Sequence, residues 1–286
     1  MNAIARSYEK VQYDLRPSKQ AERRMLVDAL QLLNDAGIPI RDYQYTGMGS
    51  IHFVDFILLH KYLGISRFLS VEISTEISKR VNFNRPYKTI ETRIGPIGTE
   101  IPTLPKDVLH ILWLDYDSVI SEEMLQDVVL ATSVLPRRSL VLVTVDVEPP
   151  GPPGGSAKEW RVHFLNNANE YLNEPNAAED FALTKLPNVC SMIVDRALNR
   201  GLQGQTDVEF IPLFHFDYAD GHKMRTLGGM IGNADDKNII HQSRLKNTKY
   251  FRGSFDDNPY KISVPRLTRR ERMYLDQGAC QLLHGL

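Results

Sequence analysis

The sequence predicts an α/β fold: a doubly wound sheet of about seven strands, mostly parallel with an antiparallel terminal hairpin, and helices on both faces. Short apolar runs alternate with segments of helical periodicity along most of the chain, which is typical of repeated β–α units. The runs at 108–117 and 139–147 are almost continuously apolar, as expected of strands buried on both faces of a parallel sheet. A turn at 220–223 then joins two strands directly, so the last strand runs antiparallel.

The composition is that of an ordinary globular protein, because 42% of the 286 residues are hydrophobic and 24% are charged. The formal net charge of −1 disfavours a dedicated nucleic-acid binder, although a local basic patch stays open. Cys190 and Cys280 lie far apart without metal-ligand spacing, so we expect neither a disulfide framework nor a zinc site. No apolar run reaches the roughly 18 residues of a membrane-spanning helix, so we expect a cytoplasmic protein without a membrane span.

We expect consecutive parts with different roles along the chain. Residues 1–40 form a helical lead, in which the periodic apolar pattern stops at Gly37. Residues 41–232 form the α/β core of the predicted domain, with an insertion at about 149–180. Residues 233–286 form a C-terminal loop and a helix that pack on the same domain.

Basic side chains gather at the start of the lead helix, where the sequence places Arg16, Lys19, Arg23 and Arg24. In one interpretation they face a substrate anion, and in the other they form a solvated helix face. Helices in this position commonly cover one edge of the sheet and the entrance to the ligand site. We therefore predict Arg16 and Lys19 as substrate-binding residues.

One β–loop–α–β unit organises the chain. It comprises a strand at 41–45, a loop of small residues at 46–50, a helix at 53–63 and a strand at 67–72. Ligands of open α/β sheets bind outside the carboxyl ends of the strands. The loop of this unit is therefore a candidate ligand site.

The loop has the features that a nucleotide-like ligand requires. Gly47 and Gly49 can adopt positive φ and have no Cβ to keep a ligand from the backbone, and the next helix offers free N–H groups. Glu72 follows at close to the roughly 20-residue spacing of dinucleotide crevices, where its carboxylate can accept hydrogen bonds from both ribose hydroxyls. The predicted cofactor-binding residues of this unit are Thr46, Gly47, Met48, Gly49, Ser50, Glu72 and Ile73.

The chain then continues with a helix, a third strand at 85–95 and a proline-rich loop at 96–107. The buried strand at 108–117 ends in polar residues at the same carboxyl edge of the sheet. Polar groups there are costly unless they are exposed or paired, so we predict Asp115 and Tyr116 as further cofactor-binding residues.

The second half of the chain begins with a helix that we expect Ser118 to cap, followed by the strand at 139–147. The segment 149–155 contains four prolines and three glycines, so it forms neither a regular helix nor a central strand. It is either a mobile lid over the site or a plain surface loop. A helical insertion and a longer helix at 182–199 precede the hairpin.

The C-terminal part is polar and basic. Basic residues between 244 and 252 surround Tyr250 and Phe251, an arrangement that suits nucleic acid, but the net charge favours an ordinary surface loop. Residues 264–275 are predicted as a final helix, with Thr268 as N-cap and Glu271 three residues later in a capping box.

Four short stretches carry a resemblance to a known family. They are RPSKQAER at 16–23, YTGMGSIHFVDF at 45–56, FNRPY at 83–87 and WLDYD at 113–117. Together with the β–α alternation and the terminal hairpin, they make the chain resemble the class I S-adenosylmethionine-dependent methyltransferases, which have a Rossmann-like fold. The resemblance is to a bacterial group described as O-methyltransferases.

The resemblance implies S-adenosyl-L-methionine as cofactor and an unidentified methyl acceptor, with a hydroxyl oxygen as one candidate. It implies that Gly47 and Gly49 pack against the methionine part of the cofactor and that Glu72 holds the ribose hydroxyls. Residues 115–117 would line the cofactor and the acceptor. Because no acid follows the third strand, we expect backbone groups around 94–97 to recognise the adenine.

Methyl transfer requires alignment of the reacting atoms and exclusion of water, and a general base only for a protonated acceptor such as a hydroxyl. Asp117 and His52 are the candidate catalytic bases, and His52 also suits a purely structural role. No carboxylate pair with metal-ligand spacing is evident, so we predict no metal ion. A homodimer stays open.

Two other functions also stay open. A nicotinamide-dependent oxidoreductase would use a similar sheet, but His52 stands where its fingerprint has the third glycine, and the terminal hairpin argues against it. A non-catalytic protein that keeps the fold to bind the cofactor or a partner is the other alternative, because fold alone does not establish function.

Overall fold

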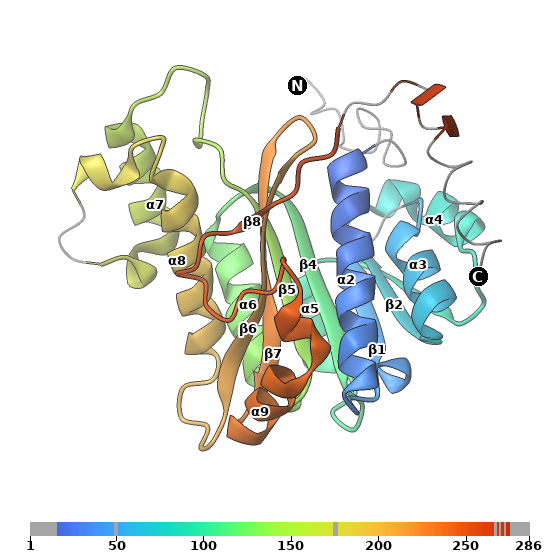
Figure 1. Cartoon of the computed structure of the whole chain (residues 1–286). Coiled ribbons are helices and arrows are strands. Elements are labelled where there is room, and N and C mark those ends of the chain that lie inside the picture. The colour runs from blue at the N-terminus through green and yellow to red at the C-terminus, as the bar shows by residue number, and fades with distance from the viewer. Residues whose placement is uncertain are drawn as a thin grey trace.

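The described part of the chain folds around an eight-stranded sheet (Figure 1). The computed structural model describes residues 16–48, 51–173, 177–265, 268, 270, 271, 273 and 274. The strands are β1 (Gln44–Met48), β2 (Arg67–Glu72), β3 (Ile90–Ile94), β4 (His110–Val119), β5 (Leu140–Asp146), β6 (Glu209–Ala219), β7 (Lys223–Gly232) and β8 (Tyr260–Lys261).

Helices connect most of these strands. The α-helices are α2 (Pro17–Asp35), α3 (Val54–Leu63), α4 (Ser78–Asn84), α5 (Ile97–Glu100), α6 (Glu122–Val134), α7 (Ala157–Ala168), α8 (Leu186–Arg200) and α9 (Ala234–Gln242). Short 3₁₀ turns are η2 (Ile40–Asp42), η3 (Thr75–Ile77), η4 (Ile101–Thr103), η5 (Asn169–Tyr171), η6 (Ala178–Phe181) and η7 (Arg244–Asn247).

The strand order is β3-β2-β1-β4-β5-β7-β6-β8. Strands β1 to β5 are parallel, whereas β7 runs antiparallel to both β5 and β6. This confirms the predicted doubly wound sheet with a terminal hairpin. The direction of winding reverses between β1 and β4, and a sheet of this kind opens a ligand crevice at the carboxyl ends of such strands.

Two apolar clusters cover opposite faces of the sheet. Successive side chains of a strand alternate between faces, so Trp113 of β4 packs with α2 and α3, whereas Leu114 packs with α6 and α8. Helix α2 buries Leu26, Leu30 and Leu33 at helical spacing. Figure 1 shows α2 and α3 on one side of the sheet.

The start of α2 is fixed to the β6–β7 turn. The backbone N–H groups of Ser18 and Lys19 donate to the carboxylate of Asp220 at 3.1 and 2.8 Å. The Ser18 hydroxyl donates to the carbonyl oxygen of Ala219 at 3.3 Å. A carboxylate at this end satisfies free N–H groups and complements the helix dipole. The first turn of α2 is therefore held at the carboxyl edge of β5, beside the crevice.

Several predicted boundaries are wrong. Strand β1 begins at Gln44 instead of residue 41, because the 3₁₀ turn η2 occupies the preceding residues. Strand β4 continues to Val119, so Ser118 lies in the strand, and Ser121 caps α6 by accepting a hydrogen bond from the Met124 N–H at 3.3 Å. Strand β3 begins only at Ile90. The predicted loop at 96–107 contains α5 and η4.

The C-terminal part adds to the same sheet, because β8 pairs in parallel with β6. This strand has two residues, too few to produce a recognisable alternation in the sequence. The capping box of the last predicted helix is present: the Thr268 N–H donates to Glu271 Oε2 at 2.6 Å, and the Glu271 N–H donates to Thr268 Oγ1 at 3.3 Å. In the described part of the chain, no helix is long and apolar enough to cross a membrane.

Candidate functional site

Predicted cofactor residues lie at the carboxyl ends of β2 and β4. Glu72 ends β2 half-buried, and its Oε1 accepts a hydrogen bond from the Ser74 N–H at 2.9 Å. Ile73 follows with 73% of its surface exposed. Its backbone neighbour Glu72 also accepts, through its carbonyl oxygen, the Gly95 N–H at 2.9 Å. The edge thus presents a carboxylate next to an open apolar surface.

Gly47 has a packing role that the sequence does not reveal. It lies within β1 and not in the following loop, and Thr46 before it is fully buried. A Cβ on Gly47 would lie 2.7 Å from Tyr45 Oη and 3.0 Å from two carbons of that ring. The glycine therefore makes room for the Tyr45 ring. Met48 ends the strand half-buried.

The remaining loop residues are described in part. Gly49 and Ser50, both predicted to bind the cofactor, lie outside the described residues. His52 is half-buried and precedes Phe53, whose backbone is left-handed with φ of 50° at the start of α3. Phe53 is fully buried, so packing compensates for a conformation that is unfavourable in residues with a Cβ.

Lys19 and Asp115 form the centre of a buried polar network. Lys19 Nζ is 2.6 Å from Asp115 Oδ1, 2.9 Å from Glu22 Oε2 and 3.1 Å from Tyr218 Oη. It also lies 4.3 Å from the centre of the Trp113 ring, a cation–π contact. The Lys19 side chain is fully buried, whereas 27% of the Asp115 side chain is exposed. Asp115 is thus the member of this pair that a ligand can reach.

Hydroxyl groups extend the network across the sheet. Trp113 Nε1 donates to Thr144 Oγ1 at 3.0 Å, and the hydroxyls of Thr144 and Thr226 lie 2.7 Å apart. Thr226 in turn donates to the Glu22 carboxylate. Neighbouring strands and α2 therefore share one buried polar network, which fixes the position of the helix on the sheet. Within the described residues, Glu22 Oε2 has the ion pair with Lys19 but no hydrogen bond.

Arg23 forms a second buried ion pair on α2. It donates through Nε to the carboxylate of Asp55 on α3, which also accepts the Tyr45 hydroxyl at 3.4 Å. Only 5% of Arg23 is exposed, yet its Nη1 has no hydrogen-bond partner among the described residues. An unpaired donor of a buried guanidinium is costly unless a ligand or a water reaches it.

Electrostatics keep the Lys19–Asp115 pair ionised. Burial lowers the pKa of Lys19, but the carboxylates of Asp115 and Glu22 outweigh burial and hold that pKa above its usual value. Burial raises the pKa of Asp115, and the Lys19 ammonium outweighs it, so this pKa lies below its usual value. The pKa of Glu22 is raised, because its burial exceeds the effect of Lys19. Asp115 therefore presents a negative charge at neutral pH.

The other polar residues of β4 point to different surroundings. The Tyr116 hydroxyl donates to Asp127 Oδ2 of α6 at 2.7 Å, and its burial raises the pKa of the phenol. Asp117 is exposed at the irregular end of the strand, where the register with β5 shifts between Asp115 and Val119. The structure thus separates Tyr116, facing a helix, from Asp117, facing solvent.

The sequence pointed to only part of this site. Lys19 and Arg23 are buried, so the interpretation of a solvated helix face is wrong for both and holds for the exposed Arg24. Glu22, Asp55 and Tyr218 were not predicted. The signal available in the sequence is the set of charged residues at positions 19, 22 and 23, which share the helix face that also carries Leu26 and Leu30.

The fold and this edge define a class of protein: an α/β protein with a cofactor crevice where the strand order reverses. The chain belongs to the family described as "Putative O-methyltransferase", whose family model matches residues 11–282. The membership confirms the methyltransferase class predicted from the sequence and supports S-adenosyl-L-methionine as its cofactor. It does not favour the oxidoreductase or the non-catalytic alternative. A comparison with curated proteins gave no match.

Among the solved structures that match this chain are a putative O-methyltransferase, an O-methyltransferase and a pre-rRNA processing protein, each with a TM-score below 0.5. A putative O-methyltransferase from Klebsiella pneumoniae has 12% identity and a TM-score of 0.41, over 72% of this chain and 80% of that chain. The O-methyltransferase TomG from Streptomyces achromogenes, in complex with SAM, has 16% identity and a TM-score of 0.39, over 72% and 80%. The fibrillarin pre-rRNA processing protein from Methanococcus jannaschii has 10% identity and a TM-score of 0.41, over 68% of each chain.

Proposed function

We propose that this methyltransferase binds S-adenosylmethionine at the carboxyl ends of β1, β2 and β4 and transfers its methyl group to an oxygen atom of the acceptor. One observation carries the placement of the cofactor. The structure combines a charged, partly exposed Asp115 with a buried Arg23 that has an unpaired N–H group. The amino-acid end of S-adenosylmethionine has the complementary charges, an ammonium and a carboxylate.

The strand register supports this placement. Gly47 of β1 pairs with Trp113 of β4, so Asp115 lies two residues closer to the carboxyl edge, beyond the end of β1. Arg23 is linked to β1 through Asp55, whose carboxylate accepts hydrogen bonds from Arg23 and from the Tyr45 hydroxyl of that strand. We infer that Asp115 binds the cofactor ammonium and that Arg23 Nη1 binds its carboxylate. Both contacts are charge-assisted hydrogen bonds, the stronger kind.

The nucleoside end would occupy the neighbouring strand end. Glu72 offers carboxylate oxygens for the ribose hydroxyls, and the exposed Ile73 offers an apolar surface for the adenine. Gly95, whose N–H donates to the Glu72 carbonyl oxygen, keeps β3 close to this edge. Lys19 acts in this proposal through Asp115, because its ammonium already has three polar partners.

The bound cofactor supplies an electrophilic methyl group on a sulfonium, and the protein must align the acceptor and exclude water. Asp117 is exposed beside Asp115 and is the candidate base for a hydroxyl acceptor, with His52 as the alternative. The segment 149–155 is exposed along most of its length and has no helix or strand, and its role as a lid stays a prediction.

The remaining predictions concern the setting of the protein. A cytoplasmic location and a homodimer stay predictions from the sequence. Nucleic acid remains a disfavoured acceptor, since the formal net charge is −1 and two basic side chains of the C-terminal part bind within the chain. Arg244 pairs with Asp35 at 2.6 Å, and Arg252 donates to the Asn258 carbonyl oxygen at 2.6 Å.

Isothermal titration of the purified protein with S-adenosylmethionine, S-adenosylhomocysteine and a nicotinamide dinucleotide tests the proposal. We expect saturable binding of the first two and none of the third. A folded, ligand-free protein that binds neither sulfur compound would contradict the proposal. Transfer of a labelled methyl group to candidate hydroxyl compounds would then identify the acceptor.

A further inference from the structure

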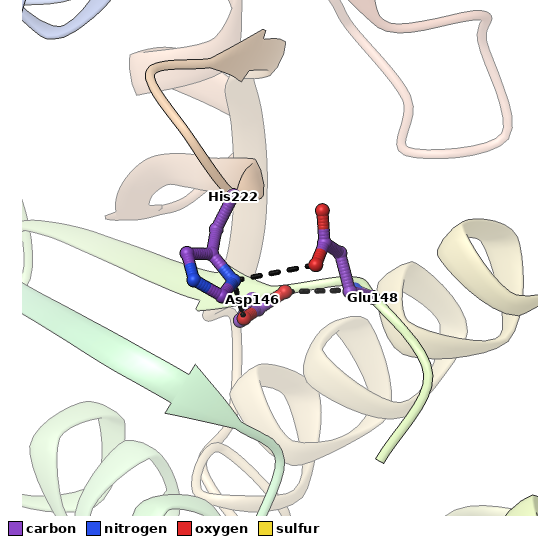
Figure 2. Close-up of side chains that lie close together, drawn as sticks. All are labelled: Asp146, Glu148 and His222. Carbon is purple, nitrogen blue, oxygen red and sulfur yellow. Dashed lines mark hydrogen bonds and ion pairs between the residues drawn. The ribbon is translucent and has the colours of Figure 1, made fainter. Parts of the chain in front are cut away.

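Three side chains with metal-binding atoms converge at the end of β5, outside the proposed cofactor site. Figure 2 shows Asp146, Glu148 and His222, whose ligand atoms all lie within 4.8 Å of one another. His222 Nδ1 is 3.2 Å from Asp146 Oδ2 and 3.3 Å from Glu148 Oε2. The imidazole points toward both carboxylates (Figure 2).

Backbone contacts hold the two contributing segments together. Asp146 is the last residue of β5, and its Oδ1 accepts the Glu148 N–H at 2.8 Å. The Lys223 N–H donates to Glu148 Oε1 at 3.1 Å, and the Val147 N–H donates to the Lys223 carbonyl oxygen at 3.0 Å. The turn that carries His222 is therefore fixed to the chain after β5. These hydrogen bonds hold the three side chains close to one another.

The charges of this group are not balanced by a permanent cation. Neither carboxylate forms an ion pair with a lysine or arginine within the described residues. Asp146 is only 7% exposed, so water compensates its charge poorly. His222 Nδ1 carries at most one hydrogen, which cannot make a linear hydrogen bond to both carboxylates. A divalent cation would interact with all three donor atoms at once.

We propose that Asp146, Glu148 and His222 form a binding site for a divalent first-row transition-metal ion such as Mn²⁺. Two carboxylate oxygens and one imidazole nitrogen suit Mn²⁺ and its neighbours in the series better than Ca²⁺ or Mg²⁺, which prefer oxygen ligands alone. Three protein ligands leave coordination positions for water or for an oxygen-bearing ligand. This inference does not depend on the proposed cofactor placement.

The three side chains lie near Asp117, the candidate base for a hydroxyl acceptor. Asp146 pairs with Val119 in the sheet register, next to the exposed Asp117 at the end of β4. The sequence alone did not reveal the group, because its ligands come from two segments that only the β5–β7 pairing brings together. The prediction of no metal ion considers only ligands that are close together in the sequence. A site whose ligands come from distant segments has no such local spacing.

A titration with Mn²⁺ alone tests the site. The full chain is first treated with a chelator, and binding is monitored by calorimetry and by the paramagnetic resonance of free Mn²⁺. We expect one saturable site in the wild-type protein. Glu148→Gln and His222→Ala should each weaken Mn²⁺ binding by about tenfold or more, because each removes a ligand. His222 is 72% exposed in a turn, so its variant should keep the fold, as circular dichroism would check.

The matched control is His241→Ala, which removes another exposed histidine from α9. We expect it to bind Mn²⁺ like the wild type. Absence of saturable binding by the wild-type protein would overturn the proposal. Wild-type affinity in either ligand variant would also overturn it, since the ion would then lie elsewhere. S-adenosylhomocysteine binding, measured on the same samples, reports separately on the cofactor site.

Discussion

Lys19 of α2 and Asp115 of β4 form an ion pair in which Nζ and Oδ1 are 2.6 Å apart. Lys19 is fully buried, whereas Asp115 keeps 27% of its side chain exposed. A helix that precedes the sheet in the chain thus fixes the charge and orientation of a carboxylate at the carboxyl edge. Helix α2 is therefore structurally part of the candidate site.

The first prediction concerns the stability of this pair. Removing one partner of a buried ion pair leaves the other uncompensated, so Lys19→Met should lower the free energy of unfolding by roughly 3–5 kcal/mol. Urea denaturation measures the change. Arg24→Met, which removes an exposed basic side chain from the same helix, is the control and should change little. Equal stability of Lys19→Met and the wild type would show that the pair contributes nothing.

A second prediction concerns the contact between Gly47 and Tyr45. A Cβ at position 47 would lie 2.7 Å from Tyr45 Oη, so Gly47→Ala should destabilise the protein by about 1–3 kcal/mol. Tyr45→Phe removes that nearest atom, so the double variant should recover part of the loss. A double-mutant cycle by urea denaturation measures this coupling. Strictly additive effects would contradict the contact.

The third prediction follows from the lowered pKa of Asp115. A group whose folded pKa lies below its unfolded value, near 3.9 for Asp, contributes stability above that value and loses it as pH falls through the folded pKa. The difference in Tm between the wild type and Asp115→Asn should therefore shrink below about pH 4. Thermal unfolding over a pH series tests this. A difference that stays constant down to complete acid unfolding would rule out an ionised Asp115.

A fourth prediction addresses the ribose contact. Glu72→Ala should weaken S-adenosylmethionine binding by about 1–3 kcal/mol through the loss of charge-assisted hydrogen bonds. Glu76→Ala, four residues further and exposed, is the matched control and should bind like the wild type. Isothermal titration compares them. Unchanged affinity in folded Glu72→Ala would remove Glu72 from the cofactor site.

Much of the fold could be predicted from local pattern. The buried strands β4 and β5 are continuous apolar runs, and the Asp220 turn between β6 and β7 has typical turn residues. The boundary of β1 could not, because pairing of Gln44 with both neighbouring strands, and not local preference, determines where it begins. The division of the chain near residues 40 and 232 stays a prediction.

The candidate site was predictable only where its residues lie near the carboxyl ends of predicted strands. Glu72 is the last residue of β2, and Asp115 lies within β4 but beyond the end of the neighbouring β1, near the edge where the rule for open sheets places ligands. The partners Asp55 and Tyr218 come from distant segments, and no local spacing connects them with Arg23 or Lys19. Arg23 and Asp55 are 32 positions apart, and Lys19 and Tyr218 are 199 apart, so only the tertiary fold brings each pair together. The sequence alone therefore shows the charges but not their pairing.

The central claim is that Asp115, held by Lys19, binds the amino-acid end of the cofactor. The most direct measurement is isothermal titration of the wild type and Asp115→Asn with S-adenosylhomocysteine and with 5′-methylthioadenosine, which lacks the amino-acid end. We predict that Asp115→Asn weakens S-adenosylhomocysteine binding by about tenfold or more and leaves 5′-methylthioadenosine binding unchanged. Equal affinity of both proteins for S-adenosylhomocysteine, or an equal loss for the two ligands, would contradict the claim.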